Sequence, residues 1–448
     1  MAEGKLNIYN LGERGVVIDK SPIHTEDGEL LAAQNAMVDT IGGLGAIRKR
    51  DGIAKINSSA LAGQVTGGIG LPLPDRAALT VTYFLALETS ANTWETSTDG
   101  TTFTPVTTPT RQKKHTNSPG DTIATAGIGN LGTHAKIALS ARGKLYYAGD
   151  DYTPGTTAPT LHMWDGTTDV TLTTIPPGPV GGLAHTIGAI VNYSDTELLI
   201  VTTDFAVTDT GRVLLFNTET GQLTQIGPET SLTPALMSAI TIWQGEIWVG
   251  GMELSGSAAP SLFHARVGSA TWAQDTGNST LTSSGWVVDL VVFKGDLYAA
   301  LALGVDTAET AKIRKKPALS GVWATAVATV GSTINDGFGP MIVSADGSTI
   351  FAFKRDTGAV PTLSIIQSTD GASWTEAYNV SANLSTAHYY AGVPILDPSG
   401  NIFWPFGSGP DSVAVNAGAL LKRTSGGTWS IVTSGKDTYR GVIGWARL

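Results

Sequence analysis

The side chains that could carry out chemistry are few and widely separated in this sequence. The seven histidines include no pair at a spacing typical of metal ligands, and there is no cysteine to act as a nucleophile or to bind a metal. No phosphate-binding glycine loop, nucleophile elbow or HExxH motif is present. These absences predict a protein that is not an enzyme, has no catalytic residues and needs no cofactor or metal.

Two acidic turns nevertheless have a defined local chemistry. Residues 97–103 read Ser-Thr-Asp-Gly-Thr-Thr-Phe, and residues 368–374 read Ser-Thr-Asp-Gly-Ala-Ser-Trp. In such a turn the aspartate accepts backbone N–H bonds, the glycine adopts a positive φ and the aromatic residue packs under the hairpin. The residues expected to form the two turns are Ser97, Asp99, Gly100 and Phe103, and Ser368, Asp370, Gly371 and Trp374.

Both turns resemble the Asp-box, a β-hairpin of sialidases and of many other propellers. In that family the box is structural and lies away from the active site, so the resemblance implies a fold and no activity. Sialidases also use an arginine triad, a Tyr–Glu nucleophile pair and an aspartate acid/base. Their Arg-Ile-Pro phrase has no counterpart ahead of the first turn, and arginines are scarce, which disfavours a glycosidase.

The strands that must carry these turns follow a repeat. A turn residue, a polar residue, Leu or Ile and usually an aromatic residue recur, and the aliphatic position returns every 49 to 53 residues. Its members are Leu145, Leu198, Ile247, Leu297, Ile350 and Ile402. A turn leading into an apolar or aromatic residue keeps the same period at Val170, Leu223, Trp272, Trp323, Trp374 and Trp429.

Each period contains four short apolar runs separated by turn signals, which is the pattern of a propeller blade. The sequence therefore predicts an all-β fold, a seven-bladed β-propeller of four-stranded antiparallel blades, with six or eight blades as alternatives. We expect the tryptophans of the second phrase to cover the core between blades. His162 and His264 fall in third-strand runs and are expected to be core or inter-blade residues.

The repeat predicts two domains. Residues 61–448 form the propeller, and residues 1–60 form an extended N-terminal arm that does not follow the period. Residues 439–448 have the pattern of another first strand, so we expect them to complete a blade begun near the start of the repeat and to close the ring. Without cysteine, no disulfide can do this.

Composition excludes several classes. A formal net charge of −10 argues against a general nucleic-acid binder. No apolar run approaches the roughly 20 residues that span a bilayer, and the polar start lacks the features of a signal peptide. The sequence predicts a protein that is made in a cytoplasm and does not enter a membrane.

The N-terminal arm contains the phrases Asp27-Gly28-Glu29, Gln34-Asn35 and Gly45-Ala46-Ile47-Arg48-Lys49-Arg50-Asp51-Gly52. This text is similar to the opening of propeller proteins from tailed-phage virions, including tail nozzle and tail-tube-associated proteins. The resemblance implies a structural protein of the virion, a nozzle or tail-hub component that acts as a rigid assembly and DNA-conduit scaffold. It also implies other tail proteins as partners, a homo-oligomeric ring and passive contact with genomic DNA in a channel.

The arm suggests how such a protein would dock. Arg48, Lys49 and Arg50 lie between two glycines, so we expect them in an exposed turn that meets a carboxylate-rich neighbour. An extended arm can also dock by strand addition. The alternative is that the arm docks on no partner and forms only a strand that leads into the propeller and packs against it.

Two other functions remain open. In the first, the propeller binds a glycan or a host receptor, and Trp404 or Tyr389-Tyr390 stack on sugar rings. In the second, which is less favoured, it is a sialidase-like glycosidase.

Overall fold

The chain divides into two compact units, Met1–Leu79 and Thr80–Leu448. The computed structural model describes residues 36–39, 46–49, 83–89, 93–106, 138–149, 159–165, 168–176, 186–203, 211–227, 236–252, 260–269, 271–275, 286–303, 310–324, 326–331, 336–356, 362–384, 390–407, 418–436 and 443–447. In the first unit these residues form β1 (Ala36–Asp39) and β2 (Ala46–Lys49), an antiparallel pair. The predicted boundary near residue 60 lies outside the described residues and stays a prediction.

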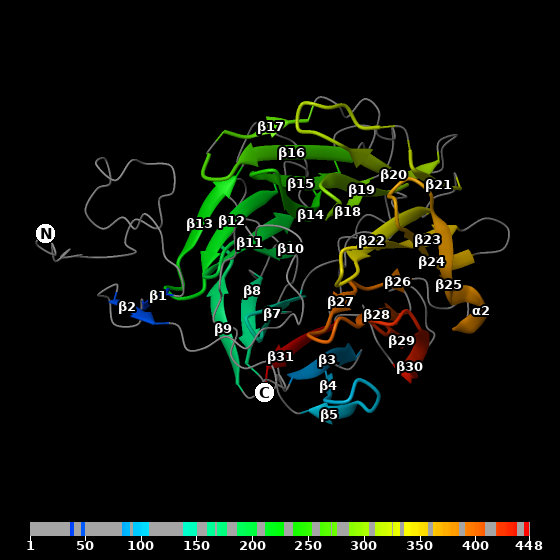
Figure 1. The fold of residues 1–448 in the computed structure, drawn as a ribbon, viewed down its shortest axis with the longest axis horizontal. Helices are drawn as coiled ribbons and strands as arrows, with labels where there is room; N and C mark the ends of the chain where they lie inside the picture. Colours follow the sequence, from blue (N-terminus) through cyan, green and yellow to red (C-terminus); the bar gives the residue numbers. More distant parts are fainter. Residues whose placement is uncertain are drawn as a thin grey trace, which may run out of the picture. The chain divides into compact units, whose positions relative to one another are not determined.

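The second unit, which we call the propeller unit, is built from antiparallel β-sheets arranged around a common axis (Figure 1). Within the described residues it has seven blades, and the fifth and sixth are joined through one residue pair, Ala302↔Gly337, into an eight-stranded sheet. Blade 1 contains β31 (Ile443–Arg447), β3 (Tyr83–Thr89), β4 (Thr93–Ser97) and β5 (Thr104–Val106). Blade 2 contains β6 (Ala138–Ala141), β7 (Lys144–Gly149), β8 (Thr160–Trp164) and β9 (Asp169–Thr174). Blade 3 contains β10 (Thr186–Asn192), β11 (Glu197–Thr203), β12 (Arg212–Asn217) and β13 (Leu223–Gly227).

The remaining blades follow in chain order. Blade 4 contains β14 (Leu236–Trp243), β15 (Glu246–Met252), β16 (Pro260–Arg266) and β17 (Ala273–Gln274). Blade 5 contains β18 (Trp286–Phe293), β19 (Asp296–Ala302), β20 (Ala311–Lys316) and β21 (Ala328–Val330). Blade 6 contains β22 (Gly337–Val343), β23 (Ile350–Asp356), β24 (Thr362–Ser368) and β25 (Thr375–Asn379), followed by the short helix α2 (Val380–Asn383). Blade 7 contains β26 (Tyr390–Ala391), β27 (Ile395–Leu396), β28 (Ile402–Gly407), β29 (Gly418–Arg423) and β30 (Trp429–Lys436).

This architecture confirms the predicted all-β, seven-bladed propeller. The first repeated phrase forms the hairpin between the first and second strands of several blades. In blades 2, 4 and 5 two successive residues at this turn have positive φ, as in Gln244 (49°) and Gly245 (77°). Two such residues make the type I′ turn, whose twist matches that of the flanking strands, and this explains why a glycine recurs there.

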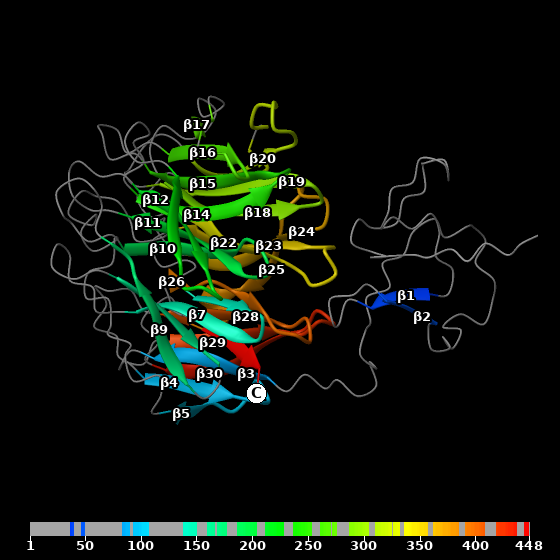
Figure 2. The same ribbon diagram turned by 90° about the vertical axis from the view of Figure 1, so that its left-hand side faces the viewer.

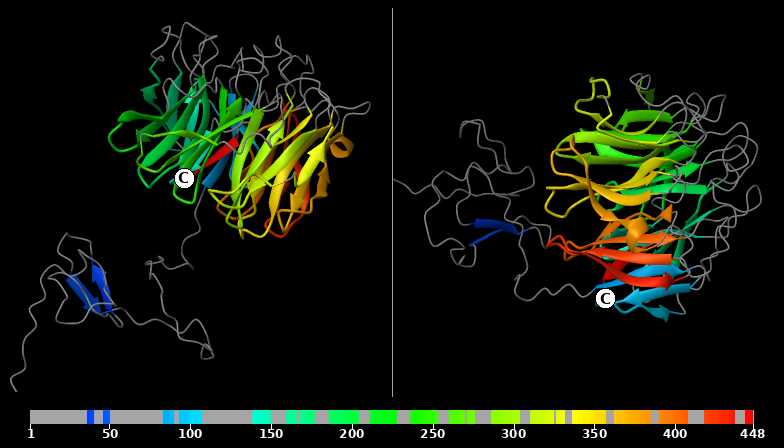
Figure 3. Two further views of the ribbon diagram at one scale, coloured as in Figure 1. Left: turned by 90° about the horizontal axis from the view of Figure 1, so that it is seen from above. Right: turned by 90° about the vertical axis from the view of Figure 1, so that its right-hand side faces the viewer.

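The hydrophobic core lies between the blades. The view turned by 90° shows the sheets of neighbouring blades stacked face to face (Figure 2), and the further views show the same arrangement (Figure 3). Each buried cluster joins residues of adjacent blades, as where Trp248 of blade 4 packs with Leu297 and Trp323 of blade 5. Blades bury both faces in this way, which a single sheet cannot do. Trp323 is buried, and Trp272 and Trp374 pack against neighbouring clusters, so they cover the core as predicted.

Blade 1 is made from both ends of the propeller unit. Strand β31 pairs antiparallel with β3, from Tyr83↔Arg447 to Leu87↔Ile443. In Figure 1 the red strand β31 lies beside the blue strand β3. Backbone hydrogen bonds between the two ends therefore close the ring. Among the described residues, no helix has the length and apolar character needed to cross a lipid bilayer.

Candidate functional site

The two acidic turns have the same hydrogen-bond network. Asp370 Oδ1 accepts the backbone N–H groups of Ala372 and Ser373, both at 2.8 Å, and the Ser368 hydroxyl at 2.9 Å. The N–H of Gly371 in turn donates to Ser368 Oγ at 2.8 Å. These donors, the Ser373 N–H first, hold the pKa of Asp370 well below its usual value.

The first turn repeats this geometry in blade 1. Asp99 Oδ1 accepts the N–H groups of Thr101 and Thr102 at 2.7 and 2.8 Å and the Ser97 hydroxyl at 2.8 Å. The Thr102 N–H makes the largest contribution to lowering the pKa of Asp99. Gly100 donates to Ser97 Oγ at 2.9 Å. Phe103 is partly buried against the cluster that joins blades 7 and 1.

Each turn also docks on an aromatic residue of the preceding blade. A Cβ added to Gly371 would overlap the Tyr298 hydroxyl and lie 2.8 Å from Tyr298 Cζ. A Cβ added to Gly100 would lie 3.0 Å from Cζ of Phe403. The backbone carbonyl of Thr369 also accepts a hydrogen bond from Lys294 Nζ at 2.7 Å. The turns therefore stabilise contacts between blades.

Sequence reasoning missed a third turn of this type. Asp346 Oδ1 accepts the Ser344 hydroxyl at 2.5 Å and the Ser348 N–H at 3.0 Å, and Gly347 has a φ of 70°. The Ser344 hydroxyl is the largest cause that lowers the pKa of Asp346 to about 2. The Ser-x-Asp-Gly spacing indicates this turn in the sequence. The turn is harder to recognise than the other two because an aliphatic residue occupies the position of their aromatic residue.

The predicted basic docking segment falls in the first unit. Arg48 and Lys49 lie in strand β2, paired with Met37 and Ala36, and not in the turn that the sequence predicted. Their side chains, and Arg50 altogether, lie outside the described residues. The docking role stays a prediction.

The aromatic residues expected to stack on a glycan do not form an exposed platform. Trp404 is fully buried in the cluster between blades 6 and 7, because both faces of β28 are covered. This rules out a sugar-stacking role for Trp404. Tyr389 and the side chain of Tyr390 lie outside the described residues.

His162 is a core residue, as predicted, whereas His264 is only partly buried. His162 is buried and stacks on Tyr147 at 5.3 Å between ring centroids. His264 stacks on Trp248 at 4.5 Å, and its Nδ1 lies 2.7 Å from Glu246 Oε2. In the described part of the chain, no group of three or more His, Asp or Glu side chains is placed to hold a metal ion.

A buried ion pair joins blades 4 and 5. Lys316 Nζ lies 3.3 Å from Asp275 Oδ2, and the side chains are 1% and 9% exposed. The indole N–H of Trp323 donates to the same Asp275 oxygen at 2.7 Å. Lys316 also lies 5.5 Å from the ring centroid of Trp248 and 5.7 Å from that of Trp323. The partners are complete without a ligand, so we assign this cluster to the packing of the two blades.

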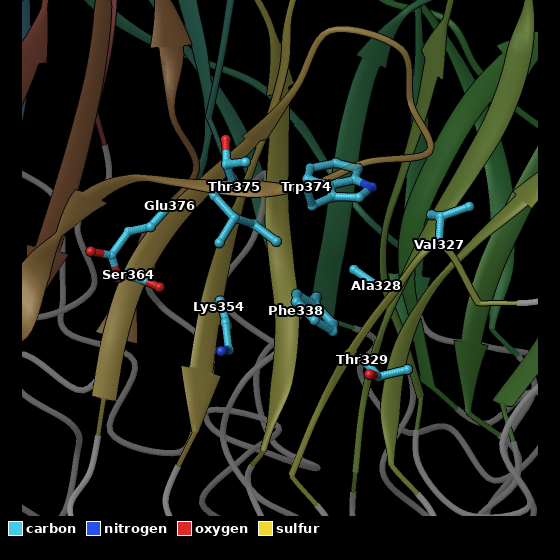
Figure 4. Close-up of a pocket in the computed structure, with 10 residues that line it drawn as sticks. Val327, Ala328, Thr329, Phe338, Lys354, Ser364, Trp374, Thr375 and Glu376 are labelled. Carbon is cyan, nitrogen blue, oxygen red and sulfur yellow. The ribbon is translucent and has the colours of Figure 1, made fainter.

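A pocket of about 290 Å³ lies between the outer strand of blade 5 and the face of blade 6. Its lining residues are Val327, Ala328, Thr329, Phe338, Lys354, Ser364, Ile366, Trp374, Thr375 and Glu376. Blade 5 contributes the first three and blade 6 the others. Figure 4 shows the rings of Trp374 and Phe338 near the middle, with Val327 and Ala328 on one side and Glu376 and Ser364 on the other. Trp374 is the only residue of the predicted turns in this lining.

The register of blade 6 places the polar side chains of the pocket together. Lys354 of β23 lies directly opposite Ser364 of β24, and Glu376 of β25 lies opposite Ile366. Since residues two apart on a strand share a face, Lys354, Ser364 and Glu376 line the same side of the sheet. Among the residues that the structure describes, none of these three side chains makes a hydrogen bond or an ion pair. The pocket therefore offers polar groups with unused bonding capacity beside an aromatic surface.

Comparison with known proteins describes the fold alone. No protein-family model matches the sequence, and no curated protein matches it. A structure described as a candidate 6-phosphogluconolactonase from Bacteroides fragilis is 12% identical with a TM-score of 0.49, over 83% of this chain and 100% of its own. The tricorn protease is 12% identical with a TM-score of 0.45, over 81% of this chain and 34% of its own. The periplasmic gluconolactonase of Pseudomonas aeruginosa is 14% identical with a TM-score of 0.44, over 66% of this chain and 81% of its own.

Two predictions from the sequence are corrected by these findings. The sequence predicted a structural protein of a phage tail and no enzymatic activity, whereas similar structures that are covered over most of their length are described as lactonases. The phage interpretation depended on residues 1–60, most of which lie outside the described part of the chain. A propeller is compatible with many functions, so the fold could not support that interpretation. Neither prediction is retained.

Proposed function

We propose that the propeller binds a small polar ligand in the pocket between blades 5 and 6. The observation that carries this proposal is a cavity of about 290 Å³ in which aromatic rings face polar side chains without partners. Ligand sites are typically concave, with polar groups that orient the ligand beside an apolar surface. The volume suits a ligand about the size of one sugar ring.

The lining supplies both kinds of contact. Phe338 is buried and fixed in the core, and the partly buried Trp374 offers an apolar surface. Lys354 and Ser364 can donate hydrogen bonds, and the Glu376 carboxylate can accept them. Because these groups bond to no described residue, a ligand displaces only water from them. A hydroxylated molecule would use the Trp374 surface and the polar groups at once.

The proposal is tested by calorimetric titration with gluconate, glucose, sorbitol and glucose 6-phosphate. Gluconolactone is added to these compounds because two of the similar structures are described as lactonases, and its hydrolysis is measured in parallel. We expect saturable binding of at least one compound. The variant Ala328→Trp fills the pocket from β21 and should abolish this binding.

The matched control is Ala273→Trp, which adds the same side chain at the start of β17, the outer strand of blade 4. This residue is exposed and away from the pocket, so binding should persist. The absence of binding by every compound would overturn the proposal. Equal binding by Ala328→Trp and the parent protein would overturn it too, because the ligand would then lie elsewhere.

A further inference from the structure

The tryptophan before or within the outer strand differs in its contacts from blade to blade. In blade 4 the Trp272 indole N–H donates to the Ile226 carbonyl of blade 3 at 2.8 Å. In blade 5 the Trp323 N–H donates to Asp275 of blade 4 at 2.7 Å. In blade 6 the Trp374 N–H is buried and has no hydrogen-bond partner among the described residues. Figure 4 shows its nitrogen directed toward Val327 of blade 5.

This difference coincides with the pocket. Among the described residues, the outer edge of blade 6 lacks the indole hydrogen bond that ties the outer edges of blades 4 and 5 to their preceding blades. An unpaired buried donor is unfavourable, and it leaves Trp374 less tightly held than its counterparts.

The polar groups of the pocket include an ammonium group and a buried hydroxyl without bonded partners among the residues that the structure describes. The Lys354 ammonium group and the Ser364 hydroxyl lie opposite each other on neighbouring strands, and neither has an acceptor within the described chain. Ser364 is only 5% exposed, and Lys354 is partly buried. The unpaired carboxylate on this face, Glu376, is exposed to solvent and can be satisfied by water. The Lys354 ammonium group thus lines the pocket as a positive charge that is paired with no carboxylate of the described chain.

We infer that the ligand carries an anionic group, a carboxylate or a phosphate, which Lys354 and Ser364 hold while the rest of the molecule packs on Trp374. This inference rests on the proposed function. An ammonium group and a hydroxyl together form charge-assisted bonds with such an oxyanion. Hydroxyl groups elsewhere on the ligand donate to Glu376 at the open side.

The test compares molecules that differ in charge. Gluconate and sorbitol are similar polyols with and without a carboxylate, and glucose 6-phosphate and glucose differ by the phosphate. In a phosphate-free buffer at low salt, we expect one anionic member to bind about tenfold or more tightly than its neutral counterpart. The pair that shows the difference identifies the anion. Raising the salt concentration should reduce the difference, and this measurement needs no variant.

Lys354→Met should lower the affinity for the anion to that for the neutral partner, and Lys354→Arg should restore part of it. Lys144→Met, which removes an exposed lysine of blade 2, should leave the affinity unchanged. Equal, salt-independent binding of charged and neutral members, unaffected by Lys354→Met, would overturn this inference and leave the proposed function standing. The absence of binding by all four compounds would overturn both.

Discussion

Replacing Gly371 with alanine tests whether the acidic turns lock neighbouring blades together. Gly371 has a φ of 72°, and the added methyl group would meet the side chain of Tyr298 in blade 5. Two effects therefore lower the free energy of unfolding, the strained backbone conformation of the alanine and the overlap of its methyl group with Tyr298. A second glycine separates them, because Gly245 has a φ of 77° and nothing lies within 4 Å of its added Cβ.

The magnitudes follow from these two sites. A left-handed conformation costs a residue with a side chain about 1–2 kcal/mol, and this is the whole cost expected for Gly245→Ala. Forcing a methyl group into a packed contact costs about 1–3 kcal/mol more, because the Tyr298 ring is buried and cannot move freely. We therefore expect Gly371→Ala to lower the free energy of unfolding by about 2–5 kcal/mol.

Urea unfolding followed by tryptophan fluorescence would measure both variants under the same conditions. Tyr298→Phe removes the hydroxyl that the methyl group would overlap, so Gly371→Ala should cost less in that background. Equal losses for Gly371→Ala and Gly245→Ala would refute the reasoning, because the contact with blade 5 would then contribute nothing. A cost of Gly371→Ala that Tyr298→Phe leaves unchanged would refute the assignment of the contact to the hydroxyl.

Three further predictions concern the charged groups and the closure of the ring. The pKa of Asp370 is lower in the folded than in the unfolded protein, so its stabilising effect is complete above about pH 4 and is lost as the pH falls toward the folded value. Asp370→Asn should therefore lose less stability than the parent protein between about pH 4 and pH 2, and an equal loss in urea titrations would contradict this. Lys316→Met leaves the Asp275 carboxylate buried without its cation and should cost about 3–5 kcal/mol, whereas an unchanged melting temperature would show that the pair is dispensable. Deleting Ile443–Arg447 removes the strand that pairs with β3 and should lower the melting temperature, and adding the same peptide should restore part of it. A truncated chain that unfolds at the same temperature as the full chain would show that this strand does not close the ring.

Much of the fold could be predicted from the sequence because its signals are local and repeated. The positive-φ turn that contains Gly245 recurs from blade to blade, and each strand needs its hairpin partner only a few residues away. The hydrogen bonds of the Asp370 turn likewise span three residues at most. These features depend on neighbours in the chain, so spacing alone indicates them.

Burial was harder to predict for single aromatic residues. Trp404 follows a polar turn and was a reasonable candidate for an exposed stacking residue. It is buried because the face of β28 that bears it packs against blade 6. Which face of a strand is covered depends on the neighbouring blade, and local pattern does not contain that information.

The sequence by itself determined the period, the blades and the acidic turns, since each depends on residues close together in the chain. Only the tertiary structure distinguished three tryptophans that occupy the same place in the repeat. Trp272 finds a carbonyl group and Trp323 a carboxylate, whereas the N–H of Trp374 finds no described partner. The acceptors come from the preceding blade, 46 and 48 residues away. The missing third acceptor marks the pocket of the proposed site, and only the packing of one blade on the next could reveal it.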